Sequence, residues 1–327
     1  MPTLSGDSYG VDELTSIFCV QYSLFKVPSE SLALENKNAP LSIILLLVLA
    51  LIWGTSFILM KKGLVVFSAG EVASLRVTVA GIILLPLAIL KWKETRSTHT
   101  SRLFLSGFMG VFIPAFLFTT AQQHIDSSVA GILNTISPLW TMIMGAVVYK
   151  LTFSRASVIG ILIGLAGTVL LIVARSGGEI TGFNLYGLLI VLACAFYGLN
   201  LNYIKFNISD LGSLAITSIS VALVAPLAAL YLFGFTDFTG KLATEPGAWK
   251  AFGYVALLAL MSTAIAVSIF NKLVKITTPL FASSVTYIMP IVSVGWGVLD
   301  GEQLFMIHFI GMAAILGGVY LANRRWS

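Results

Sequence analysis

The sequence predicts an all-α integral membrane protein with ten transmembrane helices, arranged as two inverted five-helix repeats. Hydrophobic residues make up 57% of the chain and charged residues only 10%, and the mean hydropathy of +0.96 is far above that of soluble domains. Ten apolar stretches of about 20 residues follow residue 40, each long enough to cross a bilayer as a helix. The second five stretches repeat features of the first five at an offset of roughly 150 positions.

The ten stretches define the predicted spans in chain order. Runs such as LSIILLLVLAL do not alternate as the strands of a membrane β-barrel do. The spans cover 41–60, 71–90, 103–121, 128–148, 156–173, 184–204, 211–233, 250–270, 279–298 and 304–322. They divide the chain into an N-terminal extension, residues 1–40, expected to be loosely ordered, a first repeat, residues 41–175, and a second repeat, residues 176–327.

The clearest trace of the duplication is a proline in the fourth span of each half. Residues 128–150 read SVAGILNTISPLWTMIMGAVVYK and residues 280–302 read LFASSVTYIMPIVSVGWGVLDGE, with Pro138 aligned on Pro290. Because each repeat holds an odd number of helices, the second repeat must enter the membrane upside down, as in many secondary transporters.

Lysine and arginine residues predict the orientation. If the N-terminus is cytoplasmic, thirteen of the 19 lie in cytoplasmic segments, five lie on the other face, and Arg76 lies within a span. Cytoplasmic loops are enriched in these residues, so both termini are predicted to be cytoplasmic, in a plasma or bacterial inner membrane. The positive charge is dispersed over many short loops beside the lipid bilayer, which argues against a nucleic-acid partner.

A family resemblance is carried by three segments: LIWGTSFILMKKGL at 51–64, ASLRVTVAGIILLPL at 73–87 and SSVTYIMPIVSVGWGVLDGE at 283–302. Together they resemble the EamA-type proteins of the drug/metabolite transporter superfamily, over about residues 41–325. The resemblance implies a ten-helix transporter of small organic solutes, often an exporter of amino acids or related metabolites, with a central cavity. It marks as candidates Trp53, Gly54, Arg76, Pro138, Pro290 and Glu302. Lys150 departs from the pattern, because both halves of such proteins often carry an acid there.

The two prolines also predict a substrate site. Each removes a backbone hydrogen bond and so frees the carbonyl four residues earlier, at Asn134 and at Thr286. Free acceptors beside polar side chains near the bilayer midplane are typical of substrate sites in inverted-repeat transporters. The predicted substrate-binding residues therefore include Asn134, Pro138, Thr286, Tyr287 and Pro290. The alternative interpretation is a local kink that the neighbouring polar groups satisfy.

Two aromatic residues correspond between the halves, at LIWG and AFYG. Trp53 and Tyr197 are each followed by glycine and then by polar residues, Thr55 and Ser56 in one half and Asn200 in the other. A large ring beside a glycine can line a substrate path, and an amide in an apolar span needs a partner. These five residues are predicted to bind substrate, with plain helix packing as the alternative.

Arg76 is the one basic residue well inside a predicted span. Such a residue is by default a functional hypothesis, here as the anchor of a substrate carboxylate or as the cation of a gate. Its gate partner would be Glu71, Asp300 or Glu302, of which Glu71 and Glu302 are the predicted gating residues. The alternative is that the side chain extends to the membrane interface.

These observations predict a secondary transporter that moves a small polar or zwitterionic metabolite by alternating access. No phosphate-binding glycine loop, paired catalytic carboxylates or metal-spaced His and Cys residues are recognisable, so an enzyme or a cofactor is not expected. No acid falls in the central part of a predicted span, so proton coupling is not expected either. A membrane-embedded enzyme and a lipid scramblase are the alternatives, and a homodimer is left open.

Overall fold

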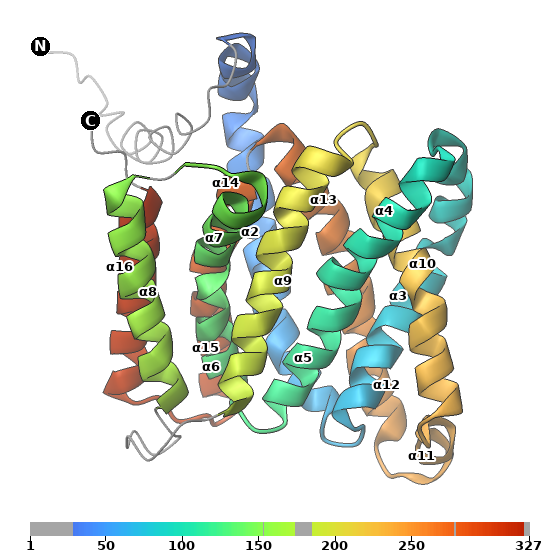
Figure 1. Cartoon of the computed structure of the whole chain (residues 1–327). Helices are drawn as coiled ribbons and strands as arrows, with labels where there is room; N and C mark the ends of the chain where they lie inside the picture. Colours follow the sequence, from blue (N-terminus) through green and yellow to red (C-terminus); the bar gives the residue numbers. More distant parts are fainter. Residues whose placement is uncertain (1–28, 153, 174–184, 278, 324–327) are drawn as a thin grey trace, which may run out of the picture.

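The described part of the chain is built from helices. The computed structural model describes residues 29–152, 154–173, 185–277 and 279–323, and every regular element within these ranges is a helix (Figure 1). Seven of the described helices are long and apolar enough to cross a membrane: Pro40–Gly63, Ala69–Glu94, Ser97–Gln122, Ser127–Tyr149, Leu185–Asn207, Ser213–Gly234 and Ala248–Ile276. Three shorter apolar helices cover Val158–Gly167, Met289–Leu299 and Met306–Gly318. The predicted all-α membrane class is confirmed.

In the first half of the chain the helices follow the predicted spans, with one difference at the start. They are α2 (Ser29–Gly63), α3 (Ala69–Lys91), η2 (Trp92–Glu94), α4 (Ser97–Gly107), η3 (Phe108–Phe112), α5 (Ile113–Gln122), α6 (Ser127–Leu133), η4 (Asn134–Ile136), α7 (Ser137–Tyr149) and α8 (Arg155–Val173). Helix α2 begins at Ser29, well before the predicted start, and continues through Pro40. A proline removes one hydrogen bond and can bend a helix without ending it. The extension predicted to be loosely ordered is thus helical from Ser29 onward, and residues 1–28 lie outside the described part.

The second half follows a similar order. Its helices are α9 (Leu185–Asn207), α10 (Ser213–Gly234), α11 (Phe238–Thr244), α12 (Ala248–Leu258), η5 (Ala259–Ile265), α13 (Ala266–Ile276), α14 (Pro279–Ser283), η6 (Ser284–Tyr287), α15 (Met289–Leu299) and α16 (Met306–Asn323). Each predicted span in this half overlaps one helix or one run of consecutive helical segments. The predicted boundary between the repeats, at residues 175 and 176, lies outside the described residues.

The third and fourth helical runs of each half change their winding at mid-length. Segments η3 and η5 are π-helical turns inside α4–η3–α5 and α12–η5–α13. Segments η4 and η6 are 3-10 turns that come just before Pro138 and Pro290. Each proline occupies one of the first two positions of the following helix, where a missing N–H costs little. The prolines therefore mark changes of winding: the helix stays continuous from Ser127 to Tyr149 through Pro138, whereas a turn at Ile288 comes before Pro290.

Close backbone contact joins α8 to α16, the pair at the left of Figure 1. A Cβ atom added to Gly318 would lie 2.5 Å from the carbonyl oxygen of Gly160 and 2.5 Å from the amide nitrogen of Gly164. Only residues without a side chain allow two helices to approach this closely. The three glycines therefore fix how this pair of helices packs.

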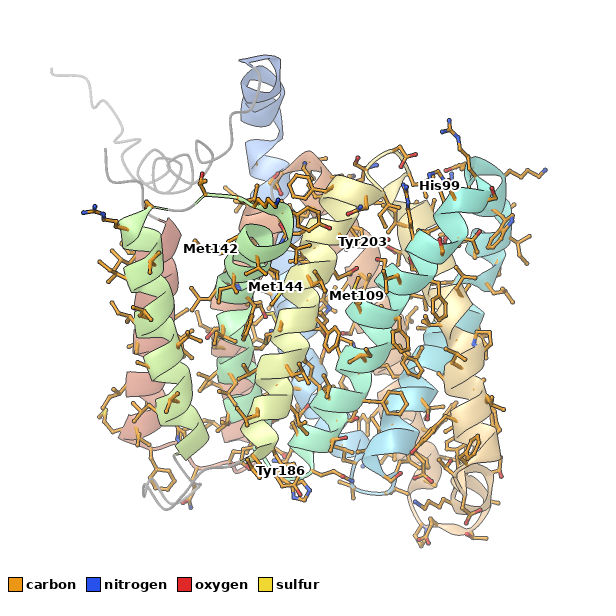
Figure 2. All side chains as sticks on the ribbon, viewed as in Figure 1. His99, Met109, Met142, Met144, Tyr186 and Tyr203 are labelled. Atoms are coloured by element: carbon orange, nitrogen blue, oxygen red, sulfur yellow. The ribbon has the colours of Figure 1, made fainter. Side chains whose placement is uncertain are left out.

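The surface of the bundle is apolar along its sides and polar at its ends. Ile82, Ile89 and Leu162 are each more than 60% exposed, which fits contact with lipid rather than water. His99 and Tyr186 mark opposite ends in Figure 2. At one end His99 Nε2 lies 3.0 Å from a carboxylate oxygen of Asp210, and at the other the Tyr186 ring stacks on His124. Side chains fill the space between the ribbons (Figure 2).

Candidate functional site

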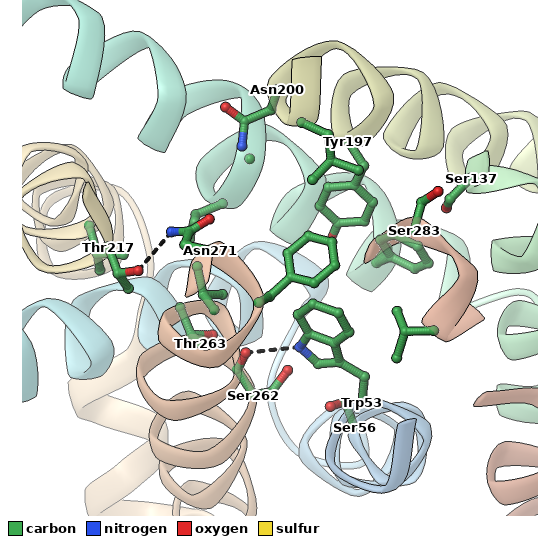
Figure 3. Close-up of a pocket in the computed structure, with 18 of the residues that line it drawn as sticks. Trp53, Ser56, Ser137, Tyr197, Asn200, Thr217, Ser262, Thr263, Asn271 and Ser283 are labelled. Atoms are coloured by element: carbon green, nitrogen blue, oxygen red, sulfur yellow. Dashed lines mark hydrogen bonds between the residues drawn. The ribbon is translucent and has the colours of Figure 1, made fainter. Parts of the chain in front are cut away.

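A cavity lies inside the bundle where α2, α3, α9 and α10 meet the interrupted third and fourth helical runs. Its volume is about 120 Å³, several times what one water molecule requires. The polar residues of its wall include Trp53, Ser56, Ser137, Tyr197, Asn200, Thr217, Ser262, Thr263, Asn271 and Ser283, which Figure 3 labels. Arg76, Ser106, Asn134, Ser220 and Thr286 also line it. A concave site that combines apolar walls with a few convergent polar groups is typical of small-ligand binding.

The π turn η5 holds Arg76 and Trp53 in one bonded group. The Arg76 guanidinium donates from Nε to Thr263 Oγ1 at 2.8 Å and from Nη2 to Ser262 Oγ at 3.3 Å. The indole Nε1 of Trp53 donates to the backbone carbonyl of Ser262 at 3.0 Å (Figure 3). A π turn departs from the regular α-helical bonding pattern, and such turns frequently occur at functional sites. Residues from α2, α3 and η5 are thereby fixed relative to one another.

Two ring pairs form part of the apolar wall of the cavity. The first ring pair consists of Trp53 and Phe270, with centroids 4.8 Å apart in an edge-to-face arrangement. The second ring pair consists of Phe118 and Tyr197, with centroids 6.0 Å apart and nearly parallel planes. Such pairs hold their rings in defined orientations, which gives the cavity a fixed shape.

Amide and hydroxyl groups line the side of the cavity next to η3 and α10. Asn200 accepts a hydrogen bond from Ser106 Oγ at 2.8 Å and packs against Gly110 in η3, where a Cβ atom would lie 2.1 Å from the amide nitrogen. Asn271 donates to Thr217 Oγ1 at 2.7 Å (Figure 3). The buried hydroxyl of Ser220 has no hydrogen-bond partner among the described residues. This wall therefore has hydrogen-bonding capacity left for a solute or water.

The two proline positions differ in how their polar residues are bonded. The Asn134 amide accepts from Cys194 Sγ at 3.5 Å, and its nitrogen lies 3.8 Å from the sulfur of Met289. Its backbone carbonyl accepts from Ser137 Oγ at 2.8 Å. Thr286 instead donates to the carbonyl of Ser283 within its own helical run, at 2.9 Å. Asn134 thus connects separate elements, whereas Thr286 is satisfied locally.

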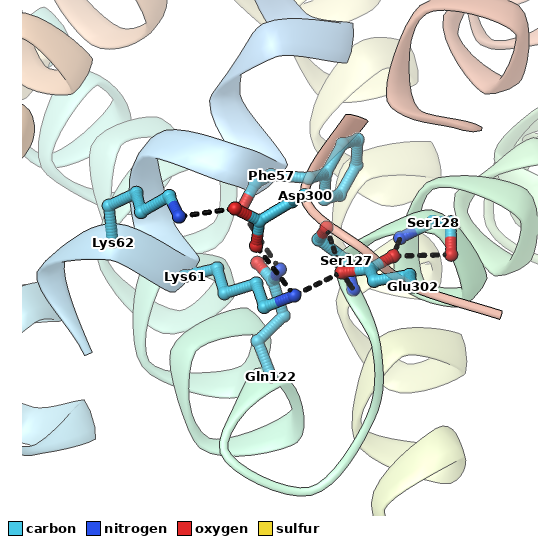
Figure 4. Close-up of polar contacts among 8 residues, drawn as sticks. All are labelled: Phe57, Lys61, Lys62, Gln122, Ser127, Ser128, Asp300 and Glu302. Atoms are coloured by element: carbon cyan, nitrogen blue, oxygen red, sulfur yellow. Dashed lines mark hydrogen bonds and ion pairs between the residues drawn. The ribbon is translucent and has the colours of Figure 1, made fainter. Parts of the chain in front are cut away.

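Glu302 is the centre of an ion-pair cluster at one end of the bundle (Figure 4). Its carboxylate accepts hydrogen bonds from the backbone N–H groups of Ser127 and Ser128 at 3.0 Å each and from both hydroxyls at 2.6 Å. Lys61 Nζ lies 2.7 Å from Glu302 and 2.9 Å from Asp300, and Lys62 also pairs with Asp300. The Glu302 side chain is only 2% exposed. The cluster joins α2, the start of α6 and the segment that follows α15.

The charge state of the two acids follows from these bonds. Burial disfavours the charged form of Glu302, but the bonds from Lys61, Ser127 and Ser128 outweigh burial and lower its pKa to about 2. Hydrogen bonds from Lys62 and Lys61 lower the pKa of Asp300 as well. Both acids are therefore ionised at neutral pH while the cluster is intact.

Glu71, the other predicted gating residue, takes part in a separate contact. It forms a capping box with Ser68 at the start of α3, accepting from the Ser68 N–H at 2.7 Å. It also pairs with Lys241 of α11 at 2.8 Å. In this conformation Arg76 bonds to hydroxyl groups, while Glu71, Asp300 and Glu302 each pair with lysine.

The structure brings most of the predicted substrate-binding residues together. Those that line the cavity are Trp53, Ser56, Arg76, Asn134, Tyr197, Asn200 and Thr286. Pro138 and Pro290 stand at helix starts beside it. Thr55 lies elsewhere, donating to the Leu51 carbonyl and accepting from Trp296 Nε1 at 3.0 Å. The side chain of Tyr287 lies outside the described part of the structure. Binding by these residues stays a prediction.

The polar residues that the sequence reasoning missed come mainly from α10 and the third helical run of the second half. They are Thr217, Ser220, Ser262, Thr263 and Asn271, with Ser106 from α4, Ser137 from α7 and Ser283 from α14. Their signal was a polar side chain within an apolar span, as at Asn200. Hydroxyl residues in membrane helices usually bond to their own backbone, so this signal is weak.

Comparison with known proteins identifies the family. The profile of the EamA-like transporter family matches residues 40–173 and again residues 184–324. The uncharacterized inner membrane transporter YedA of Escherichia coli K12 is 26% identical over 287 residues, covering 85% of this chain and 89% of the relative. An uncharacterized transporter of Archaeoglobus fulgidus is 23% identical, covering 84% of this chain and 95% of the relative. A protein crystal structure shares the fold with a TM-score of 0.60 at 20% identity, covering 86% of this chain and 96% of that one. The chain therefore belongs to the EamA-like transporter family and is a multi-pass membrane protein.

Proposed function

We propose that this protein is a secondary transporter that exports small organic metabolites by alternating access between two inverted five-helix halves. The observation that carries the proposal is the cavity at the meeting point of both π-interrupted and both proline-interrupted helical runs. In inverted-repeat transporters, substrate sites form where helices are interrupted between the two repeats. The family match in two consecutive blocks supports the same arrangement.

The ten-span arrangement rests on adding the short apolar helices to the long ones. The run α14–η6–α15 falls short of a regular spanning helix because it is broken next to Pro290, and α8 and α16 pack against each other over their length. With ten spans, both termini lie on one side, which the distribution of basic residues makes the cytoplasm.

Cysteine labelling tests this topology. Lys93 and Lys250 are both exposed. Lys93 belongs to the predicted cytoplasmic loop after the second span, and Lys250 lies at the predicted outer end of the eighth span. In a background without Cys19 and Cys194, a membrane-impermeant thiol reagent applied to intact cells should label Lys250→Cys and not Lys93→Cys. The reverse pattern would overturn the proposed orientation.

Alternating access requires the Glu302 cluster to open. In this proposal the cluster is a gate that closes one end of the substrate path, and Glu71 with Lys241 stabilises the same end through a second contact. Helices α6 and α15 are close enough to be locked there, since a Cβ atom at Gly297 would lie 3.0 Å from Ser128 Cβ. This is near the roughly 3.5–4.5 Å Cβ separation of a disulfide.

A reversible lock tests the gate. The double variant Ser128→Cys and Gly297→Cys, in the background without native cysteines, should lose solute flux on oxidation and regain it on reduction. Each single variant is the matched control and should not respond to the oxidant. Flux that persists after complete cross-linking would contradict an opening at this position.

Flux measurements separate transport from the rival activities. Purified protein in proteoliposomes should exchange labelled small metabolites, tested as a panel of amino acids and organic acids, faster than protein-free liposomes do. If the protein is instead a lipid scramblase, dithionite added outside should bleach the fluorescent lipid of both leaflets, because inner-leaflet lipid would reach the outer leaflet. An enzyme would convert the solute without moving it. Either of the last two results, with no solute exchange, would overturn the proposal.

A further inference from the structure

The charge of the cavity is unbalanced. Arg76 is the only charged residue among the described residues that line it. A cation within a membrane protein usually has an anionic partner, because an uncompensated charge at low dielectric is costly. Here the guanidinium donates hydrogen bonds to two neutral hydroxyls of the described residues, at 2.8 and 3.3 Å. The acids predicted as its gate partners are engaged elsewhere, Glu71 with Lys241 and Glu302 with Lys61.

The guanidinium is also held in one orientation. Of its five N–H groups, Thr263 and Ser262 occupy one on Nε and one on Nη2. The groups that remain are two on Nη1 and one on Nη2, which include the adjacent pair at the end of the guanidinium. This pair matches the two oxygens of a carboxylate, which arginine binds through parallel hydrogen bonds.

The remaining wall suits an apolar body and gives no place for a second charge. The first ring pair adjoins Arg76 through Ser262, which bonds to both Trp53 and Arg76. The second ring pair contributes to the same cavity. No carboxylate lies among the described lining residues, so an ammonium group would meet neutral acceptors and Arg76 itself. A net negative ligand is therefore favoured over a zwitterion or a cation.

We infer that the cavity binds a small organic monoanion, with its carboxylate held end-on by Arg76 and its apolar or aromatic body between the two ring pairs. This assignment rests on the proposed transport function and changes the expected substrate from a zwitterion to an anion. Movement of such a solute without a counter-ion carries one negative charge across the membrane. Transport should then respond to membrane potential.

Three compounds with one carbon skeleton test the assignment: 3-phenyllactate is an anion, phenylalanine a zwitterion and phenylalaninol a cation at neutral pH. Purified wild-type protein should bind phenyllactate at least about tenfold more tightly than either of the others, measured by calorimetry. Arg76→Gln should lower the affinity for phenyllactate about tenfold or more. Arg76→Lys should retain only part of the affinity, because lysine lacks the two adjacent N–H groups that bind a carboxylate in parallel. Arg102→Gln is the matched control, since Arg102 bonds to the Asn207 carbonyl outside the cavity. Its affinity should be unchanged.

A second measurement needs no variant and so does not depend on the folding of Arg76→Gln. In proteoliposomes, an inside-positive potential should accelerate phenyllactate uptake, with protein-free liposomes as the control for passive entry. Equal or tighter binding of phenylalanine or phenylalaninol, an unchanged Arg76→Gln, or no binding of phenyllactate would overturn the anion assignment. Flux of phenylalanine without phenyllactate binding would leave transport standing while the assignment fails. Arg76-dependent phenyllactate binding without any flux would support the anion assignment and contradict the proposed transport function.

Discussion

The fourth helical runs of the two halves, α6–η4–α7 and α14–η6–α15, have the same interrupted middle and different ends. Helix α6 begins with Ser127 and Ser128, whose four donors all bind Glu302. Helix α14 begins with Pro279, which has no N–H to donate. Glu302 follows α15, whereas the aligned Lys150 ends α7, exposed and in a left-handed conformation. Both halves of the duplicated sequence thus contain the interrupted helical run, whereas only the second half carries the cluster carboxylate at the aligned position.

Under the proposed alternating access, this difference implies that the two ends of the bundle open by different means. At the Glu302 end, opening separates buried opposite charges. At the other end, the bonds run mainly from basic side chains to backbone carbonyls, as from Lys205 to Thr277 at 3.1 Å and from Arg102 to Asn207 at 3.0 Å. Such bonds are individually weaker than a hydrogen-bonded ion pair. The Glu302 end should therefore be the more costly to open.

The largest expected effect is the difference in stability between a substitution at Glu302 and one at the aligned Lys150. Glu302→Gln places an amide N–H group against donors that need an acceptor and removes the charge that Lys61 pairs with. Breaking one side of a buried charge-assisted cluster should lower the free energy of unfolding by about 3 kcal/mol. Lys150→Gln, at the aligned position, should change it by less than about 0.5 kcal/mol. Thermal unfolding of both variants in detergent measures the two losses of stability. Equal losses would contradict the predicted difference between Glu302 and Lys150.

Acid should abolish the Glu302 contribution in a defined range. The folded-state pKa of Glu302 is about 2, below its ordinary value of 4.5. A group with a depressed folded-state pKa stabilises fully above its unfolded-state value and loses that stabilisation as pH falls toward its folded-state value. The stability difference between wild type and Glu302→Gln should therefore be constant from pH 8 to about 5 and shrink from about pH 4.5 downward. A difference that disappears above pH 6 would show that Glu302 is not held as described.

Substitutions in the middles of the two fourth helical runs should differ by a smaller amount in their effect on stability. Asn134→Ala removes contacts with α9 and α15 and should cost about 1 kcal/mol of stability and roughly fivefold in apparent substrate affinity. Thr286→Ala removes a bond within one helical run and should cost less than about 0.5 kcal/mol. Unfolding and proteoliposome flux of the two variants, measured side by side, test the order. A larger loss for Thr286→Ala would reverse our account of which helix break is built into the cavity.

The two lysines of the cluster should also differ in their contribution to stability. Lys61 pairs with both acids, while Lys62 pairs with Asp300 alone and its side chain is 39% exposed. Exposed ion pairs contribute little, so Lys62→Gln should cost no more than about 0.5 kcal/mol and lose that effect in high salt. Lys61→Gln should lower the free energy of unfolding by about 2 kcal/mol, because it leaves a buried Glu302 charge unpaired. Most of this loss should persist at high salt concentration. Salt titration of the two unfolding temperatures distinguishes them.

The sequence by itself determined the class of fold, the helix order and part of the cavity. Length and apolarity of the stretches predicted the helices, because a bilayer demands long apolar segments whose backbone groups bond internally. Prolines, aromatics and the single arginine in a span predicted Trp53, Arg76, Asn134, Tyr197 and Asn200, all of which line the cavity. These residues stand out because polar and helix-breaking residues are rare in membrane helices.

Tertiary structure alone decided which residues meet. The π turn at 259–265 has no proline in or next to it, in contrast to the turn at 108–112, which Pro114 follows. The sequence therefore did not indicate that Ser262 and Thr263 would face Arg76. The position of Thr55 away from the cavity depends on the rotation of α2, which packing against Trp296 sets. The partners of Glu302 lie far earlier in the chain, Ser127 by 175 residues and Lys61 by 241. A helix fixes neighbours three or four residues apart, whereas contacts between helices depend on how the whole bundle packs.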